Sequence, residues 1–424
     1  MDPRSIRRLG RRFGALWVGH TISQFGTYVA LLSLPLLVAH IQEQTGSESV
    51  LDFAFTYALE TFPAFIVGIL GGVLLDRWHL RPVMIATDLI RATAFFYLVA
   101  TLDSYGISTV FVVAFLVGSC TTFFDGALYA MIPALVPRKE LATANSLMAA
   151  SQQVMFAIGP LVAGILSATT GGPGLGLFLN GLTFVASAVS LRFVGRVAKP
   201  EVALSDPGTF LEETRRGLAH IWSEPRLRVT TIAAAVPNLV IGFVEATFVV
   251  LAATVIMTRT DTDIGVFLGA LGVGGLLGAF LAPTVVRWLG LGRSLIAGMM
   301  LAGLGLLAVV YTTFGLLTIT LQVTWMVGIL VVNVALTTIR QEYAGPGMLG
   351  RVVTAARALG WVTLPLGALL GGWLGSTPAT YPWVARTMPL LIIGTAVWLV
   401  TTVLWSDTFG PGEAMESDPV ATSP

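Results

Sequence analysis

The sequence predicts an all-α polytopic membrane protein, in which twelve transmembrane helices form two pseudo-symmetric bundles of six. Three observations lead to this prediction. Hydrophobic residues fill 55% of the 424 positions and charged residues only 11%, whereas an average soluble domain carries about 25% charged residues. Twelve apolar stretches are long enough to cross a bilayer. The basic residues collect in alternate connections between these stretches, as in chains that cross a membrane repeatedly.

The composition argues against several other classes of function. With a formal net charge of +1 and no basic groove interleaved with aromatic residues, the chain is not expected to bind nucleic acid. The single cysteine, Cys120, and four dispersed histidines predict neither disulfides nor a metal site. No phosphate-binding loop surrounds Lys139 or Lys199, so we expect no ATP motor and no cofactor. An enzyme would normally show a cluster of His, Asp and Glu near one interface of the membrane. The sequence shows no such cluster, so we do not expect an enzyme.

The spans follow from length, because a helix needs about 20 apolar residues to cross the hydrocarbon core. The stretches are continuously apolar rather than alternating, which favours helices over the strands of a barrel. We expect helices near residues 14–40, 52–75, 82–103, 108–136, 142–169, 175–196, 229–256, 264–288, 293–314, 317–339, 350–375 and 386–405.

The basic residues also predict the orientation. The N-terminal segment is basic, and the stretch that follows it is too long for a cleavable signal peptide, so we expect it to be retained as the first span. Only Arg259 and Arg386 fall in or next to connections predicted outside, and only Arg91 and Arg357 fall within spans away from their ends. Both termini are therefore predicted to be cytoplasmic, in a bacterial inner membrane.

A polar middle segment divides the chain into two halves. Residues 210, 211, 218, 221 and 222 are apolar at helical spacing, which indicates an amphipathic helix on the cytoplasmic surface. The acidic C-terminal segment is expected to be disordered. The predicted organisation is an N-terminal bundle at 1–197, a linker at 198–227, a C-terminal bundle at 228–408 and a tail at 409–424.

The two halves resemble each other at an offset of 208 residues. The segment IGPLVAGIL begins at Ile158, and LGALLGGWL begins at Leu366. Both lie in the fifth predicted span of their half, and glycines recur at the same places. Two six-helix repeats with a site between them are an architecture of transporters.

The connection after the second span carries a recognisable motif. GGVLLDRWHLRP resembles the G-x-x-x-D-R-x-x-R-R signature of the major facilitator superfamily, through Gly72, Asp76, Arg77 and Arg81, with Leu80 as a departure. The resemblance implies that Asp76 meets the N-terminus of the eleventh helix and latches the cytoplasmic side closed. The alternative is a topogenic loop without a latch. A carboxylate at a helix N-terminus gains about 0.3–1 kcal/mol.

Other segments resemble the branch of that superfamily that holds macrolide-efflux proteins and enterobactin exporters. They are FFDGALYAMIPALVPRKELATANSL, GPLVAG and GMLGRVVTAARALG, beginning at 123, 159 and 347. GPLVAG, with Gly159, Pro160 and Gly164, also resembles the helix-5 motif of antiporters, although Met155 replaces its upstream glycine.

The resemblance implies a major facilitator fold. It also implies a secondary active transporter that exports a small amphipathic organic molecule, drug-, macrolide- or siderophore-like, by proton antiport and alternating access. We expect the protein to be a monomer. An importer or uniporter is the alternative within transport, and a receptor or membrane enzyme is the alternative outside it.

Carboxylates inside the bilayer are candidates for proton coupling, because burial favours the neutral form and leaves protonation accessible. Glu60 and Glu245 are the deepest, and Asp125 is a further candidate. The alternative is a structural role between helices.

Arg91 and Asp125 are predicted at similar depth in neighbouring spans, which favours an interhelical ion pair. The alternative is a contact between Asp88 and Arg91 within one helix, with Asp125 facing a water-filled cavity.

In the superfamily, helices 1, 5, 7 and 11 line the central cavity, and several polar and aromatic residues fall on these spans. Aromatic residues with a few polar anchors suit an amphipathic ligand, and helix packing is the alternative role. The cavity candidates are Trp17, His20, Gln24, Tyr28, Asn145, Gln152, Asn238, Arg357 and Trp361.

Overall fold

The computed structural model describes residues 9–101, 106–137, 140–195, 207–345, 348–377, 379–402 and 404. Within helices it describes the backbone alone at 65–77, 142, 207–211, 213, 214, 349–351, 354, 357, 358 and 361. Side chains at these positions include part of the predicted latch and of the predicted cavity.

Each of the twelve predicted spans coincides with one helix. The first half contains α2 (Gly10–Thr45), α3 (Val50–Arg77), α4 (Leu80–Ala100), α5 (Ile107–Leu135), α6 (Leu141–Thr170) and α7 (Gly174–Val194). The second half contains α9 (Pro225–Leu251), followed by a π-helix η2 (Ala252–Ile256), α10 (Asp261–Leu289), α11 (Leu291–Val309), α12 (Leu316–Tyr343), α13 (Leu349–Leu374) and α14 (Tyr381–Val400).

Ten of these helices are long and apolar enough to cross a membrane when only the described residues are considered. The other two, α3 and α13, occupy the second and eleventh predicted spans. The chain is therefore an all-α, multi-pass membrane protein, as predicted. Helices suit these spans because hydrocarbon offers no hydrogen-bond partners to the backbone. A helix satisfies its backbone hydrogen bonds internally.

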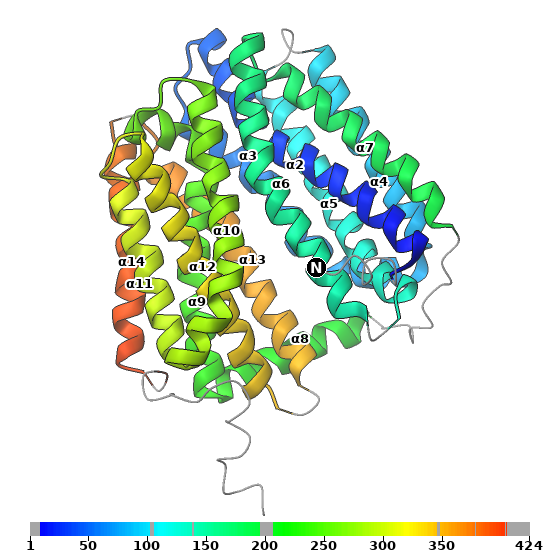
Figure 1. Ribbon diagram of the computed structural model, residues 1–424, viewed down its shortest axis with the longest axis vertical. Coiled ribbons are helices and arrows are strands. Elements are labelled where there is room, and N and C mark those ends of the chain that lie inside the picture. Colours follow the sequence, from blue (N-terminus) through cyan, green and yellow to red (C-terminus); the bar gives the residue numbers. More distant parts are fainter. Residues whose placement is uncertain are drawn as a thin grey trace, which may run out of the picture.

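The predicted linker contains a helix, α8 (Pro207–Ser223). Ile221 on α8 is buried in a small cluster with Leu227, Ala344, Val352 and Ala355, whereas Trp222 is exposed. Figure 1 shows α8 at the lower end of the molecule, lying across the direction of the long helices. A helix that is apolar on one side only is suited to this position at a surface.

Within each half, helices from distant parts of the sequence pack together (Figure 1). In the first half, α2 packs against α6 and α7, α4 against α5 and α7, and α3 against α5. In the second half, α9 packs against α13, and α12 against α10 and α11. The halves meet where α6 packs against α10 and where α3 packs against α13 and α9.

Glycines of the internal repeat occupy equivalent positions in the two halves. A Cβ at Gly159 on α6 would overlap Tyr28 on α2, and a Cβ at Gly367 on α13 would overlap the carbonyl of Leu239 on α9. Because α2 and α9 are the first helices of their halves, the two contacts are equivalent. Small residues allow such close helix packing in membranes.

The second glycine of each repeat lies between the halves. A Cβ at Gly164 on α6 would overlap the backbone of Asp261 on α10, and one at Gly372 on α13 would lie 2.5 Å from Ala54 on α3. These residues, which are 208 positions apart, therefore make equivalent helix contacts as well as having the same identity. This supports two structural repeats.

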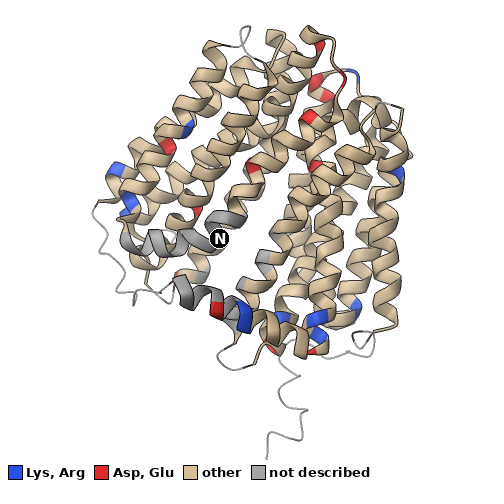
Figure 2. Cartoon of the chain, turned by 180° about the vertical axis from the view of Figure 1, so that it is seen from behind, with Lys and Arg blue, Asp and Glu red and all other residues tan. Residues whose placement is uncertain are grey.

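Contacts between the halves gather toward the face predicted to be outside, which carries the connections 46–49, 171–173 and 257–260. There Ser167 Oγ donates to Asp261 Oδ2 at 2.6 Å, next to the contact of Gly164. Figure 2 shows acidic residues at the upper end of the molecule and many of the basic residues at the lower end, near α8. We refer to these ends as the predicted outer and inner faces.

Candidate functional site

Two of the predicted carboxylates lie together where the halves meet. Tyr57 on α3 donates from its hydroxyl to Glu245 Oε2 on α9 at 2.5 Å. Glu60, one turn along α3 from Tyr57, lines the same cavity as Glu245. Residues of α2, including Leu34 and Pro35, close this cavity. It offers about 20 Å³ to the centre of a water molecule, which is room for one or two waters.

This arrangement can hold a proton between the two halves. Two ionised carboxylates in one small, largely apolar cavity would repel each other strongly, so a state with at least one of them protonated is favoured. The hydroxyl of Tyr57 gives Glu245 a donor whether or not Glu60 is charged. Any proton that enters or leaves this cavity changes a contact that joins α3 to α9.

The helix that carries Glu245 is irregular two residues beyond it. Thr247 has non-helical angles of φ −114° and ψ 16°. Its hydroxyl lies 2.7 Å from the carbonyl of Phe243 and 2.7 Å from the hydroxyl of Tyr381 on α14. The π-helix η2 follows at Ala252. Such interruptions are frequent at functional sites, and they weaken the helix locally. This irregularity is not predicted from the sequence, because a threonine in a helix interior is only a weak signal for it.

The structure pairs Arg91 with Asp88 and not with Asp125, which corrects the interhelical pair favoured from the sequence. Arg91 Nη2 lies 2.5 Å from Asp88 Oδ1, and both side chains are buried. The guanidinium also lies against the rings of Phe124 and Phe184, with its Cζ 4.7 and 4.2 Å from their centres. Residues three apart on a helix share a face, and this local spacing brings the carboxylate to the arginine.

Asp125 on α5 has a different environment. It is partly buried, and it forms no hydrogen bond or ion pair with any described residue, although the charge of Arg91 is near enough to act on it. It therefore remains a candidate for protonation, as the alternative from the sequence allows.

Two of the polar or aromatic candidates of the first span contact α6. Trp17 Nε1 donates to Ser151 Oγ at 2.8 Å, and Gln152 Nε2 donates to the Tyr28 hydroxyl at 3.1 Å. Between them, His20 Nε2 lies 3.2 Å from Gln24 Nε2. The four candidates of α2 therefore follow one side of that helix, with Trp17 and Tyr28 against α6 and His20 stacked on Phe124 of α5.

The remaining cavity candidates lie on α6, α9 and α13. Asn145 is exposed on α6. Asn238 on α9 donates to the carbonyl of Gly360 on α13 at 3.3 Å. The side chains of Arg357 and Trp361, on α13, lie outside the described residues.

Arg81 is the residue of the predicted latch whose side chain is described. Arg81 Nε donates to the carbonyl of Leu191 at 2.9 Å, and Nη2 donates to that of Arg192 at 3.2 Å. These carbonyls lie at the C-terminal end of α7, where a positive charge is favourable. Gly72, Asp76 and Arg77 are described by their backbone in α3 alone, so the latch stays a prediction.

The helix-5 motif brings two helices into close contact. A Cβ at Gly265 on α10 would lie 2.5 Å from the carbonyl oxygen of Pro160 on α6. Gly159 faces α2 and Gly164 faces the start of α10, as described above. The motif therefore lies where α6 meets both its own half and the other half.

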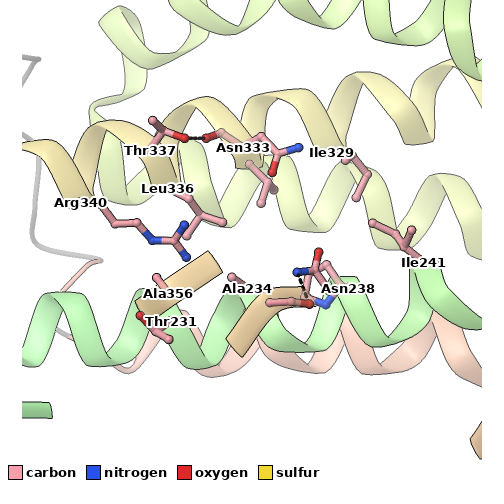
Figure 3. A pocket seen from close by; sticks show the side chains of 13 residues that line it. Thr231, Ala234, Asn238, Ile241, Ile329, Asn333, Leu336, Thr337, Arg340 and Ala356 are labelled. Carbon is pink, nitrogen blue, oxygen red and sulfur yellow. Dashed lines mark hydrogen bonds between the residues drawn. The ribbon is translucent and has the colours of Figure 1, made fainter. Parts of the chain in front are cut away.

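A larger pocket lies within the second half, and the sequence analysis did not predict it. It is lined by α9, α12 and α13, and it offers about 140 Å³ to the centre of a water molecule. Figure 3 shows Arg340, Thr337 and Asn333 along one side of α12, with the arginine side chain extending toward α9 and α13. In the sequence Arg340 is one of many basic residues near the predicted inner face, a position that gives no signal for a pocket.

Comparison with known proteins agrees with this architecture. The model of the Major Facilitator Superfamily matches residues 16–368. The multidrug efflux pump Tap of Mycolicibacterium fortuitum is 25% identical over 383 residues, which cover 87% of this chain and 90% of Tap. Macrolide efflux protein A of Streptococcus pyogenes is 27% identical over 212 residues, which cover 49% of this chain and 50% of that protein.

Among solved structures, a bacterial homologue of the iron transporter ferroportin in its inward-facing state superposes with a TM-score of 0.70. The identity is 18%, and the match covers 92% of this chain and 98% of that one. At this identity the likeness concerns the fold. The resemblance to the superfamily and, more distantly, to macrolide efflux proteins is confirmed.

Proposed function

The chain belongs to the Major Facilitator Superfamily and is a secondary transporter rather than an enzyme, and we propose that it exports a small amphipathic organic molecule in exchange for protons. The observation that carries this proposal is the cavity shared by Glu60 and Glu245, with Tyr57 bonded to Glu245 across the two halves. The names of Tap and of macrolide efflux protein A support efflux of a drug-like substrate.

The chemistry of the shared cavity suits proton exchange. An ionised Glu245 accepts a charge-assisted hydrogen bond from Tyr57, and protonation makes that bond neutral and weaker. The bond joins α3 to α9, so its strength bears on how firmly the halves hold together at the predicted outer face. Binding of a proton can in this way shift the balance between two conformations, which is the requirement for coupled transport.

The pattern of contacts supports alternating access. The described contacts between the halves, such as Ser167 with Asp261 and Tyr57 with Glu245, lie toward the predicted outer face. We propose that this conformation is closed outside, and that opening it requires these contacts to separate. The break at Thr247 gives the outer end of α9 a place to bend.

We further propose that α3 and α13 complete a set of twelve spans. The two bundles then comprise residues 1–197 and 228–408, with the linker, both termini and the C-terminal tail in the cytoplasm of a bacterial cell.

Cysteine labelling tests the orientation. In a protein with Cys120→Ala, a new cysteine at Ser47 should react with a membrane-impermeant maleimide in intact cells, because its connection is predicted outside. A cysteine at Lys139 should react only after the membrane is permeabilised. The reverse pattern would show that the two faces have been assigned the wrong way round.

Transport in proteoliposomes tests the function. With an acidic lumen, substrate should accumulate in the lumen above its outside concentration, and an ionophore that collapses the proton gradient should stop this. The panel comprises macrolides, siderophores and cationic dyes. Movement only down the substrate's own gradient, at the same rate with and without a proton gradient, would contradict antiport and favour a uniporter.

A further inference from the structure

We propose that the pocket between α9, α12 and α13 binds an anionic group, a carboxylate or a phosphate, through the guanidinium of Arg340. If the pocket is a part of the substrate site, this inference rests on the proposed function. Binding of an anion can be measured without transport, so a failure of anion binding and a failure of proton-coupled export are distinguishable.

The first argument is the state of Arg340 itself. The side chain is partly buried, and its Nε has no hydrogen-bond partner among the described residues. No ion pair is formed with it by any described carboxylate. The guanidinium is thus incompletely paired at its buried Nε, and a planar anion is the partner that fits its paired donors.

The second argument is what surrounds the guanidinium. No Asp or Glu is among the described residues that line the pocket, so the local charge there is positive. Thr231, Asn238, Asn333 and Thr337 contribute hydroxyl and amide groups to the lining. Neutral polar groups with one cation form a site that favours an anion over a cation and orients it by hydrogen bonds.

The third argument is that this side of α12 faces water rather than lipid. Asn333 is exposed and lies six residues before the end of the predicted span at residue 339, which corresponds to a depth of about 9 Å in the hydrocarbon. An amide facing hydrocarbon at that depth would be unfavourable. The pocket continues from Arg340 toward Ile241 and Ile329, so a ligand with an anionic end and an apolar body can fill it.

The test measures thermal unfolding of the full chain in nanodiscs of phosphatidylcholine. Benzoate and inorganic phosphate serve as anionic probes at constant ionic strength, and benzamide serves as a neutral probe of the same shape as benzoate. Ligands that bind the folded state raise the melting temperature with concentration. We expect a saturable rise with at least one of the two anions and none with benzamide.

Variants tie the effect to Arg340. Arg340→Gln should abolish the rise, whereas Arg287→Gln, which removes an exposed arginine toward the same face, should keep it. Thr337→Asp should also abolish the rise without loss of folding. The new carboxylate lies three residues before Arg340, the spacing of Asp88 and Arg91 in this chain. It can therefore form an ion pair with the guanidinium of Arg340 and exclude an added anion.

Nanodiscs that contain phosphatidylglycerol separate the two sources of the anion. If these lipids raise the melting temperature of the unmodified chain but not of Arg340→Gln, and the soluble anions have no effect, the site binds a lipid phosphate. A rise with benzoate or inorganic phosphate identifies a soluble ligand. No rise with any anion, an equal rise with benzamide, or a rise that persists in both Arg340→Gln and Thr337→Asp would overturn the proposal.

Discussion

Replacing Glu245 by Gln is expected to abolish uphill, proton-driven transport while leaving the fold and substrate binding intact. The amide oxygen of Gln can still accept the hydrogen bond from Tyr57, so the contact between α3 and α9 is kept. The side chain can no longer take up or release a proton, and it resembles a carboxyl that is permanently neutral. The measurement is substrate accumulation in proteoliposomes with an acidic lumen, which should fall to the level of empty vesicles.

Matched variants decide which group carries the proton. Glu60→Gln tests the second carboxyl of the same cavity, and Glu43→Gln removes an exposed carboxyl and should transport normally. Substrate exchange at equal pH on both sides should survive in Glu245→Gln, since it needs no net proton movement. If both single variants and the double variant still drive uphill accumulation, neither glutamate takes part in coupling.

The helices could be predicted from the sequence because the hydrocarbon core offers no hydrogen-bond partners to the backbone. A continuous apolar stretch of sufficient length must form a helix, and each predicted span coincides with one. Glu60 and Glu245 could be identified as candidates for the same reason, because charge is rare inside such stretches. Their shared cavity could not be predicted, since it depends on how α3 and α9 pack across the two halves.

The error at Arg91 shows where sequence reasoning lacked information. Counting residues along two spans placed Arg91 and Asp125 at similar depth, and depth along a helix can be counted reliably. The direction in which each side chain points around its helix also matters. Asp88 is three residues from Arg91 on one helix, so its direction was fixed by the spacing alone. The local contact thus prevailed over the distant one.

Arg340 was overlooked for a related reason. Basic residues near inner helix ends determine the orientation of membrane proteins, and that general role was sufficient to explain an arginine in the last turn of α12. Only the packing of α9, α12 and α13 shows that its side chain extends into a pocket.

Replacing Asp88 by Ala is expected to be among the most destabilising single substitutions in the first half. Its carboxylate and the guanidinium of Arg91 are both buried, with 0% and 3% of the side chains exposed. Removing one partner of a buried ion pair leaves the other charge without compensation, which typically costs about 3–5 kcal/mol. The rings of Phe124 and Phe184 hold the guanidinium in place, so it cannot readily turn toward water. The measurement is unfolding of the purified protein in detergent.

Asp125→Ala is the matched control, since it removes a partly buried carboxylate that forms no ion pair among the described residues. We expect its effect on unfolding to be small. Asp88→Ala combined with Arg91→Leu should be less destabilising than the sum of the two single changes, because the double variant leaves no charge unpaired. An Asp125→Ala variant as unstable as Asp88→Ala would show that Arg91 depends on both carboxylates. Strict additivity of the Asp88 and Arg91 effects would show that the close contact contributes nothing to stability.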